Sequence, residues 1–245
     1  MSSTRIAIHA DEPRTRVDLV AGAIVPRLIE RGPRSARIAL VAGGALLLGG
    51  DRVDIAVTVG SGCTLDLEDI GGTVAYASDG VAAFWDVEVT LGADSRLRWA
   101  GLPLVIADSA DVHRQTRIRL GDGAIAVIRE SVVLGRSGER GGRIRHRTSV
   151  ADAEGPVLEE ELDADGGAPV PGVLGANRVL DTIIRVGDRP PAATGRGATF
   201  MALSAPGAIA RYLGDAAHAS PLAEIWNEWA DLPLAVERNA VDVTG

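Results

Sequence analysis

The sequence predicts a mainly β fold, a β-helix or solenoid-like stack of sheets with a few helices near the C-terminus. Apolar and polar residues alternate along several segments, a strand, glycine turn, strand unit recurs, and helix signals appear only after about residue 200. Hydrophobic residues make up 46% of the chain but aromatic residues only 3%. We therefore expect a core of aliphatic side chains, which favours extended strands.

The chain of 245 residues is long enough for one domain or two. We expect one domain over residues 1–245. A β scaffold over residues 1–165 would be followed by a strand and a helical part over residues 166–245, since a loop rich in glycine and proline begins there.

Alternation with a period of two residues is clearest in residues 53–59, where aliphatic residues occupy every second position. Residues 85–91 repeat this pattern, and residues 117–120 repeat it again. Each segment therefore predicts a strand with one buried and one solvated face.

Each of these segments ends at a glycine that starts a short turn into another strand. The three glycines, Gly60, Gly92 and Gly121, are spaced by 32 and then 29 residues. A unit that recurs at such a spacing buries its faces against its neighbours, which predicts stacked β layers. An ordinary antiparallel sandwich with glycine-containing turns fits the same periodicity.

The C-terminal part combines strand and helix signals. Residues 178–186 are a strand candidate between two loops. Ser204 is suited to cap a helix over residues 206–213, and Ser220 followed by proline is suited to begin a helix over residues 222–230.

The second of these helices carries one apolar stripe, formed by Leu222, Ile225, Trp226 and Trp229. These residues follow the spacing of one helix face. We expect the stripe to pack on the sheet, and we favour this over a surface on which Trp226 and Trp229 dock a partner.

Composition excludes several classes of function. A formal net charge of −8 argues against a nucleic-acid binder. Cys63 is the only cysteine, so an intrachain disulfide and a cysteine zinc cluster are both excluded. The longest apolar stretch, residues 38–48, is too short to cross a membrane. We expect a soluble cytoplasmic protein without a membrane or nucleic-acid partner.

Patterns of catalytic residues are sparse. The four histidines are scattered without the spacing of a zinc-binding helix. Asp108, Ser109 and His113 lack the glycine-flanked elbow that positions a nucleophilic serine. Asp66 and Glu68 share one face of a strand, where they would hold a hard cation or simply face solvent.

An arginine-rich segment follows over residues 136–147. Arg143, Arg145 and Arg147 alternate with other residues along a predicted strand, and Arg140 precedes them. Guanidinium groups on a rigid strand suit docking to carboxylates of a partner protein. The alternative is a solvated surface that pairs with the glutamates at positions 159–161.

Four motifs in series resemble the UreD family of urease accessory proteins, also called UreH. They are Gly49-Gly50-Asp51 before an alternating strand, residues 71–76 ending in Tyr76, Leu97-Arg98-Trp99 followed by Pro103, and Glu130 to Arg136 with Gly135 and Glu139. The order and spacing of all four match the family pattern. Val74 stands where the family usually has lysine, and Arg98 where it usually has an acid.

The resemblance implies a β-helical scaffold that bridges urease subunits and a UreF-type protein, which in turn holds a nickel-carrying UreG-type GTPase. Such a protein is a urease maturation factor and not an enzyme. It binds no permanent cofactor and no tightly held metal, and Ni(II) passes transiently through water-filled tunnels. The motif residues with a structural role would be Gly49, Gly50, Tyr76, Trp99, Gly135, Arg136 and Glu139.

An ion route needs weak, spaced oxygen ligands that permit release. On this logic we expect Asp51, Glu130 and Glu160 to line the nickel path, because each matches an acidic position of the family blocks. The alternative is that these acids pair with buried arginines or cap turns.

Two rival functions require other residues. A metal-dependent hydrolase on a β scaffold would use Asp66, Glu68 and a histidine as ligands. A polysaccharide-binding solenoid would need rows of exposed aromatic residues, and two Phe, two Tyr and four Trp do not supply them.

Overall fold

The computed structural model describes residues 3–77, 79–192 and 197–231, and nearly all of its regular structure is β. A seven-stranded sheet has the order β14 (Pro156–Asp165), β13 (Arg143–Ala151), β11 (Asp111–Leu120), β8 (Ala83–Leu91), β5 (Arg52–Val59), β1 (Thr4–His9), β2 (Arg16–Val20).

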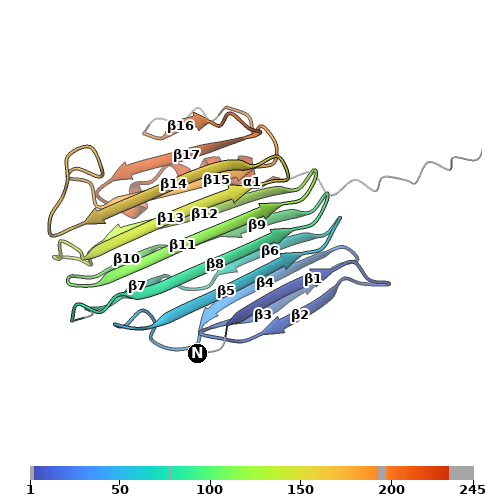
Figure 1. Ribbon diagram of the computed structural model, residues 1–245, viewed down its shortest axis with the longest axis horizontal. Helices are drawn as coiled ribbons and strands as arrows, with labels where there is room; N and C mark the ends of the chain where they lie inside the picture. Colours follow the sequence, from blue (N-terminus) through green and yellow to red (C-terminus); the bar gives the residue numbers. More distant parts are fainter. Residues whose placement is uncertain (1–2, 78, 193–196, 232–245) are drawn as a thin grey trace, which may run out of the picture.

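A ten-stranded sheet faces it (Figure 1). Its main path has the order β16 (Thr199–Ala202), β17 (Gly207–Gly214), β15 (Val179–Val186), β12 (Ile125–Leu134), β9 (Arg96–Ala100), β6 (Thr64–Asp69), β4 (Ser35–Ala42), β3 (Ile24–Arg31). The short strand β10 (Leu104–Ile106) lies between β12 and β7 (Thr73–Ala75). A 3₁₀ turn (Ala217–Ala219) precedes the helix α1 (Leu222–Ala230).

The chain winds between the two sheets as a solenoid does. From β4 to β13 the main strands alternate between the ten-stranded and the seven-stranded sheet. Neighbours within each sheet are parallel, as in β5, β8, β11 and β13 or in β4, β6, β9 and β12. The predicted solenoid-like stack is thus confirmed, and the antiparallel sandwich is wrong for this central part.

Both ends of the stack change to antiparallel pairing. At one end β1 pairs with β2 and β3 with β4. At the other end β13 pairs with β14, and β15 lies between β12 and β17, which is followed by β16. The parallel coils are therefore enclosed between reversed strands.

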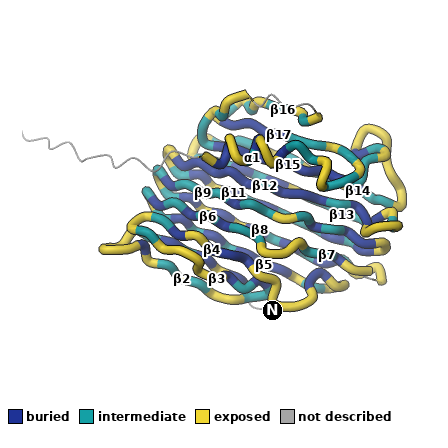
Figure 2. Tube along the Cα trace, turned by 180° about the vertical axis from the view of Figure 1, so that it is seen from behind, coloured by how far each residue is buried: buried dark blue, intermediate teal, exposed yellow. Residues whose placement is uncertain are grey.

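Alternation along each strand places the core between the sheets. In β5, Val53, Ile55, Val57 and Val59 are buried, while the residues between them are partly accessible. Figure 2 shows buried stretches running through the central strands of both sheets, with exposed residues gathered at turns and edges. The core consists mainly of aliphatic side chains, as the composition predicts.

The recurring glycines stack at one corner of the coils. The amide of Gly92 donates to the carbonyl of Val59, and that of Gly121 donates to Leu91, each at 2.8 Å. A Cβ atom on Gly121 would lie 2.7 Å from the Leu91 carbonyl oxygen and 2.7 Å from the carbonyl carbon of Gly92. Successive corners approach this closely because they lack side chains.

The C-terminal part contains more strand than the sequence predicts. The strand at residues 178–186 is confirmed by β15 and the helix at 222–230 by α1. The prediction of a helix over residues 206–213 is wrong, because this segment forms strand β17, which pairs with β15 on one side and β16 on the other. Ser204 lies in the turn that joins β16 to β17, where Leu203 donates its amide to Gly207. Sheet pairing outweighs the local capping signal.

Helix α1 covers the outer face of the ten-stranded sheet with the predicted apolar stripe. Leu222, Ile225 and Trp229 are buried, and they form a second core with outward-facing residues of β12, β15 and β17. The Trp229 ring meets Phe200 edge-on at 5.8 Å. Within the described residues no helix has the length and apolar character of a membrane span.

The corner stack gives a testable expectation. Gly121→Ala should lower the free energy of unfolding by about 1–3 kcal/mol, because the added Cβ overlaps the backbone of the preceding corner. Gly44→Ala is the matched control, since its Cβ would meet nothing within 4 Å. Urea denaturation followed by circular dichroism measures both, and equal stabilities for the two variants would contradict the close packing of the corners.

Candidate functional site

A row of polar side chains crosses the otherwise aliphatic space between the sheets. We call it the interior polar row, and its members are Asp69, Arg114, Thr116, Glu130, His146, Thr148, Glu160, Thr182 and Arg211. Register aligns them, since Thr116 lies beside Thr148 and Thr148 beside Glu160 in the seven-stranded sheet. In the ten-stranded sheet, Thr182 lies between Glu130 and Arg211. The row thus runs across the strands, along the direction in which the coils stack.

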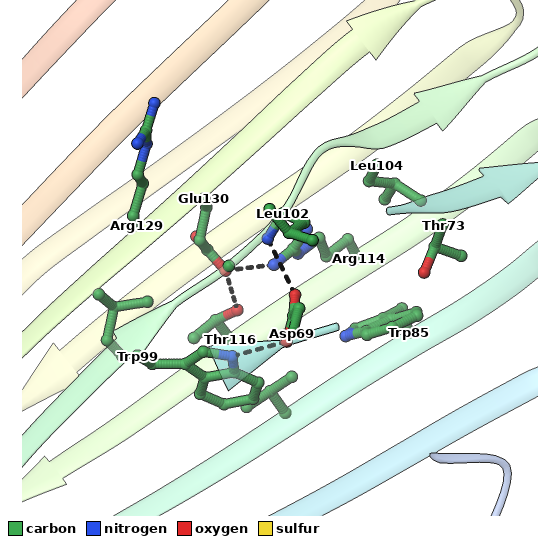
Figure 3. A pocket seen from close by; sticks show the side chains of 13 residues that line it. Asp69, Thr73, Trp85, Trp99, Leu102, Leu104, Arg114, Thr116, Arg129 and Glu130 are labelled. Atoms are coloured by element: carbon green, nitrogen blue, oxygen red, sulfur yellow. Dashed lines mark hydrogen bonds and ion pairs between the residues drawn. The ribbon is translucent and has the colours of Figure 1, made fainter. Parts of the chain in front are cut away.

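Two small cavities meet at Glu130. The first is lined by the side chains shown in Figure 3, including Asp69, Trp85 and Arg114. The second is lined by Glu130, His146 and Glu160 together with threonine, arginine and aliphatic side chains. Each has a volume of about 20 Å³, which is room for about one water molecule.

Glu130 is buried and engaged from several strands. Arg114 donates a hydrogen bond of 2.7 Å and Thr116 one of 2.9 Å to its Oε1 atom. The Nε2 atom of His146 lies 3.3 Å from its Oε2 atom. Burial opposes ionisation, but Arg114, His146 and Thr116 together hold the pKa of Glu130 well below its usual range. Glu130 is therefore a carboxylate at neutral pH.

Glu160 is half-buried at the far side of the second cavity. The Nη2 atom of Arg211 lies 2.6 Å and 2.7 Å from its two carboxylate oxygens. Arg211 also donates to the hydroxyl of Thr182 at 3.3 Å. Glu130 and Glu160 thus each share the interior with an arginine from another strand.

Asp69 is a member of the row that the sequence analysis did not single out. It accepts hydrogen bonds from the indole Nε1 of Trp99 at 3.1 Å and from the Leu102 amide at 3.0 Å. Burial raises the pKa of Asp69. The signal was available, because Asp69 follows Leu65 and Leu67 on the inward-facing positions of β6.

Of the three acids expected on an ion path, Glu130 and Glu160 lie together and Asp51 does not. Asp51 closes a turn before β5, where its Oδ2 atom accepts from the Leu48 amide at 3.0 Å. It lines neither of the two cavities that meet at Glu130. This local contact is the turn-capping alternative that the sequence analysis left open.

The other motif residues occupy turns and contacts around the coils. Gly49 and Gly50 form the turn that Asp51 closes, and Gly50 has a φ of 85°. Tyr76 is 39% exposed after β7. A Cβ on Gly135 would lie 2.7 Å from the Gly141 amide nitrogen.

The remaining motif residues make polar contacts. Arg136 and Glu139 form an ion pair across the turn after Gly135. The indole Nε1 of Trp99 donates a hydrogen bond to Asp69. The departure at Arg98 is accommodated, because Arg98 pairs with Asp66 on the neighbouring strand β6.

The predicted docking residues divide into paired and unpaired side chains. Arg143 and Arg145 lie 2.6 Å and 3.7 Å from Asp163, and Arg147 lies 3.4 Å from Glu159. Arg140 makes no side-chain ion pair with any residue that the structure describes. Both tryptophans belong to α1, where Trp226 is half-buried and Trp229 is fully buried.

The two acids that the hydrolase hypothesis assigns as metal ligands form ion pairs with arginines. Asp66 pairs with Arg98, and Glu68 lies 2.7 Å from Arg37. In residues 3–77, 79–192 and 197–231, no group of three or more His, Cys, Asp or Glu side chains is close enough to hold a metal ion. The interior polar row has room for about one water molecule in each of its two cavities, and the described residues do not form a metal cage.

Comparison with known proteins gives the family. The family model described as UreD urease accessory protein matches residues 20–240. "Urease accessory protein UreD 1" of Streptomyces griseus is 41% identical over 197 residues, which cover 78% of this chain and 76% of that protein. "Urease accessory protein UreD" of Streptomyces coelicolor is 31% identical over 215 residues, covering 79% and 85%. The chain therefore belongs to the UreD family of urease accessory proteins.

Proposed function

We propose that this protein is a non-catalytic scaffold of urease maturation, which binds urease and other accessory proteins and offers nickel a route through its interior. The observation that carries the proposal is the interior polar row, with two cavities that meet at the buried Glu130 carboxylate. Membership in a family named for urease accessory proteins supplies the biological setting. Nickel is here a cargo and not a resident cofactor.

The chemistry of the row suits passage better than storage. Glu130 and Glu160 are each already balanced by an arginine, so a divalent cation would have to compete with a guanidinium for either carboxylate. Such competition weakens binding and favours release. A cage of several histidines or cysteines would instead trap the ion.

The proposed partners are urease subunits and UreF-type and UreG-type accessory proteins in the cytoplasm. The stacked coils make a rigid platform for such contacts, because each central strand is paired on both sides. The exposed guanidinium of Arg140 is the arginine of the docking set that is best placed to meet a carboxylate of a partner.

Glu160 offers a test with a neighbour as control. In a host that makes urease and its accessory proteins, Glu160→Gln should lower the nickel content of urease several-fold, because an oxygen ligand of the route loses its charge. Glu159→Gln should leave it unchanged, since Glu159 is exposed and pairs with Arg147. Mass spectrometry of the purified urease measures nickel per subunit.

The amount of partner protein that co-purifies with each variant distinguishes the scaffold role from the nickel route. If both variants bind the partners as the unaltered protein does, a nickel deficit with Glu160→Gln alone supports the interior route. Equal nickel contents in both urease preparations would reject the route, and normal urease activation in cells that lack the protein would reject the whole function.

The buried ion pair predicts a stability effect that depends on pH. Glu130→Gln should cost roughly 3 kcal/mol at pH 7, because Arg114 stays buried without its counter-charge. The folded protein lowers the pKa of Glu130, so the stabilisation is fully present above the carboxyl pKa of the unfolded chain, about 4.3. It is lost progressively as the pH falls from that value toward the lower pKa of the folded protein, because the unfolded chain takes up a proton that the buried carboxylate does not.

Urea denaturation at pH 7 and at pH 3.5 measures this difference, which should shrink at the lower pH. Glu88→Gln is the control, since Glu88 and its partner Arg117 lie on the surface, and its effect should stay within about 0.5 kcal/mol. A Glu130→Gln variant as stable as the unaltered protein at pH 7 would show that Arg114 does not depend on this carboxylate.

A further inference from the structure

We propose that His146 and Glu130 form a two-ligand site for a first-row divalent cation, and that His146 makes the interior selective for nickel over hard cations such as magnesium. The inference rests on the proposed nickel route and deepens it. It assigns to one histidine a role that the acids of the row cannot perform. In the sequence, His146 is one of four scattered histidines without a metal-binding spacing.

The geometry of the pair fits two adjacent ligands of one ion. The Nε2 atom of His146 and the Oε2 atom of Glu130 are 3.3 Å apart. Two ligands at a right angle, each bound at about 2.1 Å, lie about 3.0 Å from each other. An adjustment of a few tenths of an ångström would therefore let both atoms bind the same cation.

The surrounding contacts leave these two atoms oriented toward each other. Arg114 and Thr116 both hold the Oε1 atom of Glu130, so its Oε2 atom is the one directed toward His146. The hydroxyl of Thr148 lies 3.3 Å from His146 Nε2 and adds a neutral oxygen. Both protein ligands are largely buried, with side-chain exposures of 11% for His146 and 5% for Glu130.

The adjoining cavity provides a place for exchangeable ligands. It is lined by His146, Glu130, Thr148 and Glu160, and its volume admits about one water molecule. Because the described residues bring no third strong ligand close, an ion here would complete its shell with water and hydroxyl oxygens. Arg114 also competes for the carboxylate, so binding stays weak enough for the ion to leave.

Selectivity follows from the nitrogen ligand. Imidazole nitrogen binds nickel well, whereas magnesium takes oxygen ligands and gives up water reluctantly. Asp69 and Glu160 offer oxygen alone and do not separate the two ions. His146 is therefore the member of the row able to make that distinction.

Nuclear magnetic resonance of the isolated full chain tests the site with nickel ions alone. The chain has four histidines, so the imidazole signals are few enough to assign by substitution. Paramagnetic Ni²⁺ should broaden the His146 signals at concentrations that leave those of His113 unchanged. His113 is the internal reference, because it is paired with Arg145 at 2.8 Å and lies against the Phe84 ring.

Calorimetry gives a second measurement. His146→Gln should weaken Ni²⁺ binding at least ten-fold and leave Mg²⁺ binding unchanged, whereas His113→Gln should change neither. Circular dichroism verifies that both variants fold. Should His146→Gln fail to fold, the signals of the unaltered protein still decide the matter. Unbroadened His146 signals, or equal nickel affinity in the two folded variants, would overturn the site.

The two proposals fail in different ways. Broadened His146 signals together with full urease nickel content for Glu160→Gln would keep the site and reject the route. A nickel deficit for Glu160→Gln with unperturbed His146 signals would keep the route and reject the site.

Discussion

In-register parallel stacking is the constraint on which the rest of this structure depends. When strands stack in register, equivalent positions of successive coils lie beside each other, so a residue type that recurs at one position becomes a continuous line. Aliphatic positions become the core in this way. Polar positions become the interior polar row. The glycine corners permit the close approach of backbones that keeps this register.

The row is stable because its charges satisfy one another across the two sheets. Glu130 comes from β12, whereas Arg114 and Thr116 come from β11 and His146 from β13. A buried carboxylate without such partners would be strongly destabilising. The same ion pairs are the contacts with which a cation would have to compete on the proposed nickel route. The contacts that stabilise the buried charges of the fold would therefore also set how weakly the proposed route holds an ion.

Sequence periodicity predicts the strands and turns of the coils well, but it predicts the contacts of the polar side chains inside them less well. The alternation in residues 53–59 and the spacing of Gly60, Gly92 and Gly121 are local patterns, and each appears in the structure as expected. Family-like motifs singled out Glu130 and Glu160. The pairing of Glu130 with Arg114 and His146 could not be predicted, because it joins residues from different sheets.

The contacts of Ser204 and Asp51 also depend on more than the local sequence. Ser204 resembles a helix cap, but the strand that follows it finds hydrogen-bond partners in β15, which precedes it by about twenty residues. Asp51 belongs to a family motif, yet its side chain serves the turn in which it lies. In both cases the deciding partner or geometry is visible only once the chain has folded.

The reversed strands at the two ends of the stack also limit its growth. A parallel solenoid offers a template at each end on which another coil, or another molecule, can continue the same pattern. Here the last neighbours run in the opposite direction, so an incoming coil meets no parallel edge to extend. The fold thereby sets its own length, and with it the number of layers through which an interior passage would have to run.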